Sequence, residues 1–220
     1  MSVGLRAGIL FDVDGTLVDT NYLHTLAWSS AFADTDQWTP MNAIHRLLGM
    51  GGDHLVPRLI DHECPDAVAA RTVRYQELIG DAKAFPGAHE LVTSAHEIGL
   101  VTALATSSPA DELDFLIDHL DIADVLDAST TGDEIESSKP DPEIFIRAME
   151  SAVLDPAQMM VVGDSVWDVQ AARGAGLACV AVESGGVSRH ELSEAGAVQV
   201  YRDVAEIRHQ LQTSPLARLL

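Results

Sequence analysis

The chain has 220 residues, 47% of them hydrophobic, which is enough for one compact domain with a small insertion. A formal net charge of -21 argues against nucleic acid or an anionic membrane as a partner, and it means that an anionic substrate needs a local cation. No apolar stretch approaches the ~20 residues that span a bilayer, and the N-terminus lacks signal-peptide architecture, so we expect a soluble, cytoplasmic protein. Cys64 and Cys179 have neither metal-site nor disulfide spacing.

The first expected strand, residues 8–11, is apolar throughout and runs directly into Asp12-Val13-Asp14-Gly15-Thr16. If the strand continues, its period of two places the carboxylates of Asp12 and Asp14 on the same side. Two carboxylates so close repel each other, so the site would need a cation, a shared proton or both. The alternative is a turn that caps the next helix, which explains one aspartate well and two poorly.

Residues 21–84 show a helical pattern with no convincing strand. Apolar residues spaced three or four apart mark four helices, and Phe85-Pro86-Gly87 ends the helical stretch. Helices placed between two α/β segments indicate an inserted helical domain. We therefore predict an α/β core formed by residues 1–18 and 86–220, and an inserted helical domain formed by residues 19–85.

From residue 86 onward, helical patterns alternate with short apolar strands. The expected strands cover residues 100–105, 125–128, 159–162, 177–182 and 198–201. This alternation predicts an α/β fold with a doubly wound, Rossmann-like parallel sheet. Open sheets of this kind place their chemistry at the carboxyl ends of the strands, where the acidic motif also lies.

Three later strand ends or loops carry candidate functional residues. Thr106 and Ser107 follow the second core strand, although Ser108 also has the pattern of a helix N-cap, with Pro109 as the first helical residue. Lys139 is one of only two lysines in the chain. Asp164 follows another apolar strand, and its carboxylate could bind a hard cation. Asp168 is a weaker candidate for a direct ligand, because its spacing from Ser165 is that of a helix capping box.

These motifs together resemble the haloacid dehalogenase-like superfamily. Residues Asp12 to Thr16 match the family's first motif, Thr106 its second, Lys139-Pro140 its third, and Gly163-Asp164 with Asp168 its fourth. The resemblance covers essentially the whole chain. A helical insertion between the first and second motifs is similar to the cap of the phosphoglycolate phosphatase and β-phosphoglucomutase-like subgroup.

The resemblance implies a phosphatase that uses Mg²⁺ and an aspartyl-phosphate intermediate on a small phosphorylated metabolite. Asp12 would be the nucleophile and Asp14 the general acid and base. The metal would be held by Asp12, the backbone carbonyl of Asp14, and Asp164. Three residues would bind the phosphoryl oxygens: Thr106, Ser107 and Lys139.

Further residues are weaker candidates. Asp168 could lie in the outer shell of the metal, and Gly51 and Gly52 fall where the family's substrate loop lies in the cap. His24 is expected either to reach the cleft between cap and core or to form a structural hydrogen bond near the hinge. The sequence predicts no oligomeric state.

Two alternatives remain open. A β-phosphoglucomutase-like mutase shares the first cap segment, but the mutase's loop carries an arginine where Gly49 to Asp53 lie here, which favours a hydrolase. A non-enzymatic signalling protein that accepts a phosphoryl group shares the Asp, Thr and Lys set, but it would place the phosphoacceptor in mid-chain rather than on the first strand.

Overall fold

The computed structural model describes residues 5–220, and its centre is a six-stranded parallel sheet. The strands are β1 (Arg6–Phe11), β4 (Val101–Ala105), β5 (Ala128–Thr130), β6 (Leu154–Gly163), β7 (Ala178–Val182) and β8 (Gln199–Tyr201). Their spatial order is β5-β4-β1-β6-β7-β8, so the chain moves outward from β1 in both directions. The predicted doubly wound α/β fold is confirmed. Successive strands are added on one side of β1 as far as β5 and on the other side from β6 onward.

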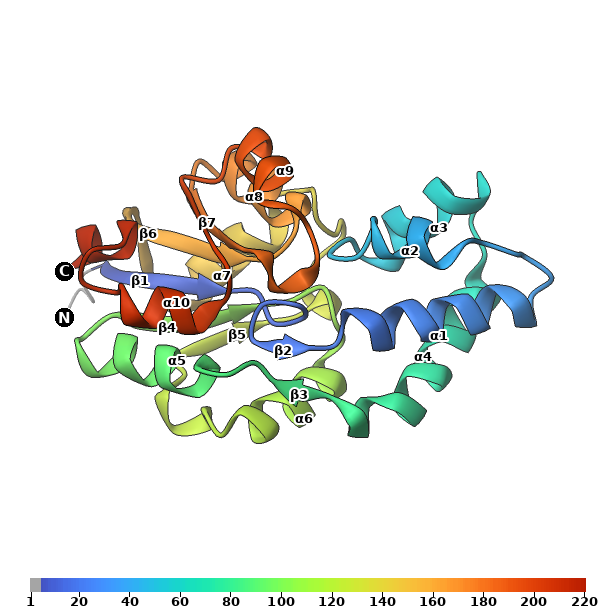
Figure 1. Cartoon of the computed structure of the whole chain (residues 1–220), viewed down its shortest axis with the longest axis horizontal. Coiled ribbons are helices and arrows are strands. Elements are labelled where there is room, and N and C mark those ends of the chain that lie inside the picture. Colours follow the sequence, from blue (N-terminus) through green and yellow to red (C-terminus); the bar gives the residue numbers. More distant parts are fainter. Residues whose placement is uncertain (1–4) are drawn as a thin grey trace.

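Helices cover both faces of the sheet, with α5 and α10 on one face and α7, α8 and α9 on the other (Figure 1). Their bounds are α5 (Ala88–Glu97), α6 (Ala110–Leu120), α7 (Glu143–Ala152), α8 (Val166–Gly174), α9 (Arg189–Ala195) and α10 (Val204–His209). Along β1, Ile9 and Phe11 belong to the first core cluster and Leu10 to the second. The strand is therefore buried on both faces, as its continuous apolar run predicts.

Two strands begin three or more residues away from their predicted starts. β6 begins at Leu154, five residues before the expected start, because its first half pairs with β1 near Arg6 before the register shifts. Asp155 and Pro156 interrupt the apolar pattern there, which hid that half of the strand. β5 begins at Ala128, where the predicted strand ends.

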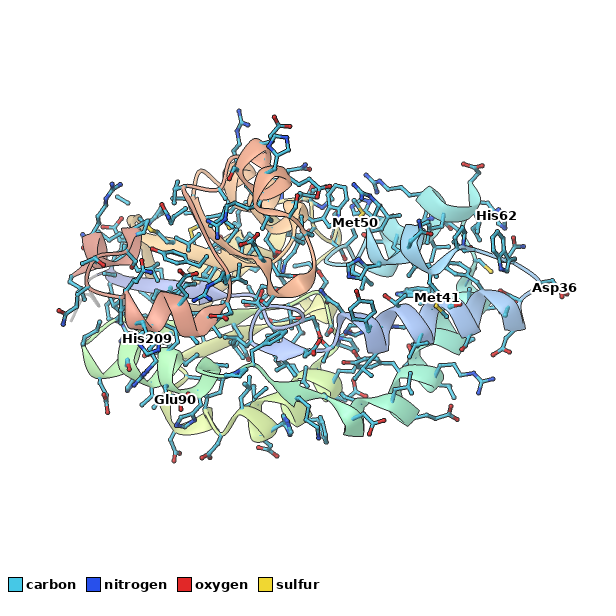
Figure 2. All side chains as sticks on the ribbon, in the orientation of Figure 1. Asp36, Met41, Met50, His62, Glu90 and His209 are labelled. Carbon is cyan, nitrogen blue, oxygen red and sulfur yellow. The ribbon has the colours of Figure 1, made fainter. Side chains whose placement is uncertain are left out.

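The four predicted helices between the first two motifs are α1 (Asn21–Asp34), α2 (Met41–His45), α3 (Gly52–Ile60) and α4 (Pro65–Leu78). They project beyond the carboxyl end of β1, on the right in Figure 1, around a separate apolar cluster that includes Trp28 and Phe32. An antiparallel pair, β2 (Val18–Asp19) and β3 (Lys83–Ala84), joins them to the sheet. Figure 2 shows Met50 on the side of these helices that faces the sheet, and Asp36 at their far tip.

Two helices that begin beside the sheet edge test the predicted N-caps. Ser165 and Asp168 form the predicted capping box at the start of α8. The predicted N-cap at Ser108 is wrong, because α6 begins at Ala110 with Pro109 as its N-cap, and Ser108 bonds elsewhere. None of the helices formed by residues 5–220 is long and apolar enough to cross a membrane.

Candidate active site

The four motifs meet at the carboxyl edge of the sheet because parallel strands all end there. β1 delivers Asp12, β4 delivers Thr106, and β6 delivers Asp164. Lys139 reaches the same place from the loop between η3 (Gly132–Glu134) and α7. All four side chains are buried, with exposed fractions of 5%, 1%, 3% and 1% respectively. The structure therefore brings together residues that lie up to 152 positions apart in the sequence, counted as 164 minus 12.

A cluster of three carboxylates surrounds the Lys139 ammonium. One oxygen each from Asp12, Asp164 and Asp168 lies within 4.8 Å of the others. Lys139 Nζ lies 2.6 Å from Asp12 Oδ1 and 2.8 Å from Asp168 Oδ1, and it also donates to the Ala105 carbonyl at 3.2 Å. One ammonium faces three carboxylates, so a further positive charge would be needed to balance the buried cluster.

Burial makes this charge imbalance costly, and the pKa values show it. Burial raises the pKa of Asp12 from 3.8 to about 7, although Lys139 opposes the shift. Burial, followed by the charges of Asp12 and Asp168, raises the pKa of Asp164 well above its usual value. Burial lowers the pKa of Lys139, but the neighbouring carboxylates outweigh it and keep this lysine charged. A hard divalent cation would remove the excess negative charge at this point.

The surroundings of Asp164 fit such a cation. Asn21 Nδ2 donates to Asp164 Oδ2 at 2.9 Å and to the Gly185 carbonyl at 3.2 Å, which fixes the carboxylate. A Cβ added at Gly185 would lie 1.6 Å from Asp164 Oδ2, and one added at Gly15 would lie 2.3 Å from it. These glycines leave the backbone close to the carboxylate cluster. The oxygen-rich donor set therefore suits Mg²⁺, with Asp12 and Asp164 as the side chains that would hold it.

The side chain of Asp14 lies apart from this cluster. β1 ends at Phe11 and the chain turns, with three successive N–H groups (residues 16–18) donating to the Val13 carbonyl, so the two aspartates do not lie along one strand. Asp14 Oδ1 accepts from Thr20 Oγ1 at 2.6 Å and contacts His24 Nε2 at 2.9 Å, while Oδ2 accepts from Ser108 Oγ at 2.9 Å. Asp14 is thus aimed away from the three carboxylates and toward the helices.

Burial would raise the pKa of Asp14, but His24 and the hydrogen bonds from His24, Thr20 and Ser108 outweigh burial. The pKa of Asp14 therefore lies well below its usual range, and this carboxylate is ionised at neutral pH. The two aspartates of the first motif differ in their environments. Asp12 has a raised pKa beside an ammonium, and Asp14 has a lowered pKa beside an imidazole and two hydroxyls.

A polar chain extends from Asp14 through the helices and back to the sheet domain. Arg71 NH2 lies 2.8 Å from His24 Nδ1, and Arg71 NH1 donates to Glu112 Oε1 at 2.7 Å. Because a guanidinium only donates, His24 Nδ1 must accept, and the ring proton must lie on Nε2. His24 Nε2 then donates to Asp14 Oδ1. His24 also stacks on Tyr75 with ring centroids 4.0 Å apart.

The expected phosphate-binding residues lie at the end of β4. Thr106 Oγ1 accepts from the Ser108 N–H at 3.1 Å and is within 3.4 Å of Asp14 Oδ2. Ser107 Oγ is buried and has no hydrogen-bond partner among the described residues, so it offers a free donor beside Asp12 and Asp14. Asp168 combines both of its expected environments, since Oδ2 accepts from Ser165 in the capping box and Oδ1 faces Lys139.

A cavity of about 260 Å³ opens over Asp12 and Asp14 between the sheet edge and the helices. Gly51, Gly52 and His24 line it. Several contacts close the helices over the sheet edge: His24 with Asp14, Arg71 with Glu112, and Asp53 Oδ2 with the Ser138 N–H at 3.0 Å. The cavity is therefore partly enclosed.

Sequence reasoning missed four residues of this site. These are Asn21, Arg71, Ser108 and Glu112. Ser108 carried a signal, because it follows the second motif directly, but its capping pattern pointed elsewhere. Arg71 is one of four arginines between residues 19 and 85, and nothing in the sequence distinguishes it from the others. Glu112 lies on α6, and nothing in the sequence around it indicates a role in the site.

Comparisons with known proteins agree with this architecture. The profile of the haloacid dehalogenase-like hydrolase family matches residues 7–176. The CbbY protein of Cereibacter sphaeroides is 30% identical over 216 residues, covering 90% of this chain and 93% of its own. A phosphoglycolate phosphatase of Rhodospirillum rubrum is 30% identical over 214 residues, covering 90% and 88%.

Solved structures give the same result. A hydrolase from Pseudomonas syringae is 30% identical and matches 94% of this chain and 98% of its own with a TM-score of 0.88. CbbY from Rhodobacter sphaeroides, in complex with xylulose-1,5-bisphosphate, is 28% identical and matches 92% and 96% with a TM-score of 0.77. The chain therefore belongs to the haloacid dehalogenase-like hydrolases, and the predictions of this family and of a hydrolytic enzyme are confirmed.

Proposed function

We propose that this protein is an Mg²⁺-dependent phosphatase that hydrolyses a small organic phosphate monoester through an aspartyl-phosphate intermediate. One observation carries the proposal. Asp12 is held by a buried lysine, beside two further carboxylates, under a cavity that also exposes a second, hydrogen-bonded aspartate. Relatives named phosphoglycolate phosphatase and CbbY support the same class of reaction.

In the first step, a carboxylate oxygen of Asp12 attacks phosphorus, and the bond between phosphorus and the leaving alcohol breaks. Lys139 Nζ on Oδ1 and Thr16 Oγ1 on Oδ2, at 2.6 Å and 3.0 Å, hold the carboxylate in place. The approach of a dianionic phosphate raises the proton affinity of Asp14 and so offsets its low pKa, and Asp14 takes up a proton from solvent as the substrate binds. Asp14 then gives this proton to the departing oxygen.

In the second step, water attacks the phosphorus, the bond between phosphorus and Asp12 breaks, and Asp14 takes the proton from the water. Asp14 thus regains the proton that it gave in the first step, and releases it to solvent when the phosphate leaves. His24, fixed by Arg71 as a donor, keeps the Asp14 carboxylate oriented in both steps. We assign Thr106 and Ser107 to the phosphoryl oxygens, and Lys139 to both Asp12 and the phosphoryl group.

Asp12 and Asp164, with the backbone carbonyl of Asp14, would hold the Mg²⁺. The ion would supply positive charge that offsets the repulsion between an anionic nucleophile and an anionic substrate. Asp168 would act from the outer shell, since its oxygens already contact Ser165 and Lys139.

We further propose that residues 19–85 act as a cap on the core formed by residues 1–18 and 86–220. The chain passes between these two parts twice, and both connections lie at the antiparallel pair β2 and β3, which suits a hinge. A closed cap would exclude bulk water from the intermediate, and Gly51 and Gly52 would then border the substrate. Such an enzyme needs neither a nucleic acid nor a membrane partner, and a cytoplasmic location suits it.

The mutase alternative has less support. In the loop that would carry a mutase's phosphate-binding arginine, residues 49–53 hold none, and the nearby Arg46 bonds to Glu191 at 2.8 Å outside the cavity. A non-enzymatic phosphoacceptor is set aside because the chain belongs to a hydrolase family.

Phosphate release from a panel of small phosphate esters, with and without Mg²⁺, tests the proposal, with Asp12→Asn alongside. We expect many turnovers per enzyme that require both Mg²⁺ and Asp12. Isomerisation of a hexose phosphate without phosphate release would replace the phosphatase by a mutase.

A further inference from the structure

We propose that the substrate of this enzyme has an uncharged leaving alcohol, so that its phosphate is its only anionic group. This inference rests on the proposed phosphatase function and narrows its substrate class. It follows from where the cap places its positive charges.

The cavity is lined partly by apolar side chains and offers few cations. Its apolar lining residues, glycines aside, are Trp28, Leu48, Met50, Val68 and Pro109. Among residues 5–220, Arg71 is the only arginine or lysine that lines the cavity. The charged residue opposite is Asp133, which is negative and exposed at the cavity edge. An anionic leaving group would therefore lose water without gaining a free counter-charge.

Arg71 is already neutralised. Its two terminal nitrogens donate to both oxygens of Glu112, at 2.7 Å and 3.4 Å, and one of them also donates to His24. The Glu112 side chain is 2% exposed and that of Arg71 12% exposed, so the pair is shielded from water and strongly coupled. Burial raises the pKa of Glu112, and Arg71 opposes that shift. The forked face of the guanidinium that binds anions is therefore occupied by Glu112.

The other positive element at the cavity is the start of α3, where Gly51 is the N-cap. Asp53 lies in the first turn of this helix, and its carboxylate accepts from the Ser138 N–H. A carboxylate in the first turn offsets the positive end of the helix dipole. This end of α3 therefore presents no net positive charge to the substrate.

The remaining cap cations are placed elsewhere. Arg46 bonds to Glu191 and Arg74 to Asp34, both outside the cavity. Arg58 donates to the His54 carbonyl, and Lys83 lies on β3. None of them lines the cavity. Phosphoglycolate carries a carboxylate and xylulose-1,5-bisphosphate a second phosphate, so both would place an anion against a lining whose one arginine among residues 5–220 is already paired. This enzyme should differ from its relatives in that respect.

Two esters of the same size test the inference. Phosphoglycolate and hydroxyethyl phosphate differ only in a carboxylate against a hydroxymethyl group. We expect kcat/KM for hydroxyethyl phosphate to exceed that for phosphoglycolate by about tenfold or more, because burying an unpaired anion is costly. The carboxylate of phosphoglycolate also experiences the -21 net charge of the chain, so the comparison of two arginine variants below separates this long-range repulsion from the local effect.

A cation introduced on α4 provides the second arm. Val68 lines the cavity and its side chain can carry a charge to the edge, since the residue is 41% exposed. Val68→Arg should raise kcat/KM for phosphoglycolate by about tenfold and change that for hydroxyethyl phosphate by less than about twofold. Val73→Arg is the control, because Val73 is 57% exposed on the same helix, outside the cavity, and the substitution adds the same charge.

Each outcome has one meaning. Phosphoglycolate turned over as well as hydroxyethyl phosphate by the unaltered enzyme overturns the inference and leaves the phosphatase intact. Equal effects of Val68→Arg and Val73→Arg on phosphoglycolate also overturn it. If neither ester, nor an activated aryl phosphate, releases phosphate, then the phosphatase itself fails, and the inference fails with it.

Discussion

Gly185 offers a sharp test of the metal site, because a single methyl group there collides with Asp164. A Cβ at this position would lie 1.6 Å from Asp164 Oδ2 and 2.4 Å from its Cγ. Contacts under 3.0 Å essentially never occur at real Cβ atoms, so the carboxylate or the backbone of η4 (Glu183–Gly185) must move. Gly185 has no positive φ, so its backbone does not itself exclude alanine.

The displacement needed sets the magnitude. Restoring an ordinary contact of 3.4 Å requires a shift of about 1.8 Å, which is large beside the 2.0–2.1 Å length of an Mg–O bond. Asn21 bonds to both Asp164 and the Gly185 carbonyl, so it resists the relative movement of the two. We expect Gly185→Ala to weaken Mg²⁺ binding by about 10- to 100-fold, the range that follows from disturbing the support of a metal ligand.

Calorimetric titration of the metal-free protein with Mg²⁺ measures this directly, with circular dichroism to establish folding. Gly80→Ala is the matched control, since Gly80 also lies in a short 3₁₀ segment and a Cβ there meets nothing within 4 Å. The control should bind Mg²⁺ like the unaltered protein. Folded Gly185→Ala protein with undiminished Mg²⁺ affinity would show that Asp164 does not hold the metal.

Three further predictions follow from the buried charges. Lys139→Met leaves the carboxylate cluster without its ammonium, so the free energy of unfolding of the metal-free protein should fall by about 3–5 kcal/mol in urea titrations; a loss under about 1 kcal/mol would contradict the proposed charge balance. The pKa of Asp12 is raised to about 7 without metal, so protons should compete with Mg²⁺ for this carboxylate below pH 7. The Mg²⁺ affinity should therefore be constant above pH 7 and fall about tenfold for each pH unit below it. Mg²⁺ titrations that show no such pH dependence would contradict this prediction. Arg71→Met should lower kcat about tenfold with little change in KM, because His24 is no longer fixed as a donor, whereas Arg74→Met, exposed on the same helix, should leave kcat unchanged.

Much of the site followed from the sequence for a simple geometric reason. Strands of a parallel sheet end at one edge, so Asp12, Thr106 and Asp164 had to lie near one another once each was placed after a strand. The capping box at Ser165 was equally local, since it depends on residues three apart.

The rest depended on contacts between distant elements. The Arg71–Glu112 pair joins α4 to α6 across 41 positions, and no periodicity indicates which cap arginine faces the core. Ser108 could serve either a helix end or Asp14, and the choice rests on where α6 begins. The expectation that β1 continues through both aspartates is wrong, because the chain turns after Phe11 and the N–H groups of residues 16–18 bond to the Val13 carbonyl.

The most direct test of the central claim is to capture the phosphorylated enzyme. The protein, turning over its best ester with Mg²⁺, is quenched in acid and reduced with borohydride, which converts an aspartyl phosphate to homoserine. Peptide mass spectrometry should then find homoserine at position 12, and none in unreacted protein or in Asp12→Asn. Rapid phosphate release with an unmodified Asp12, or with homoserine at another aspartate, would contradict the account.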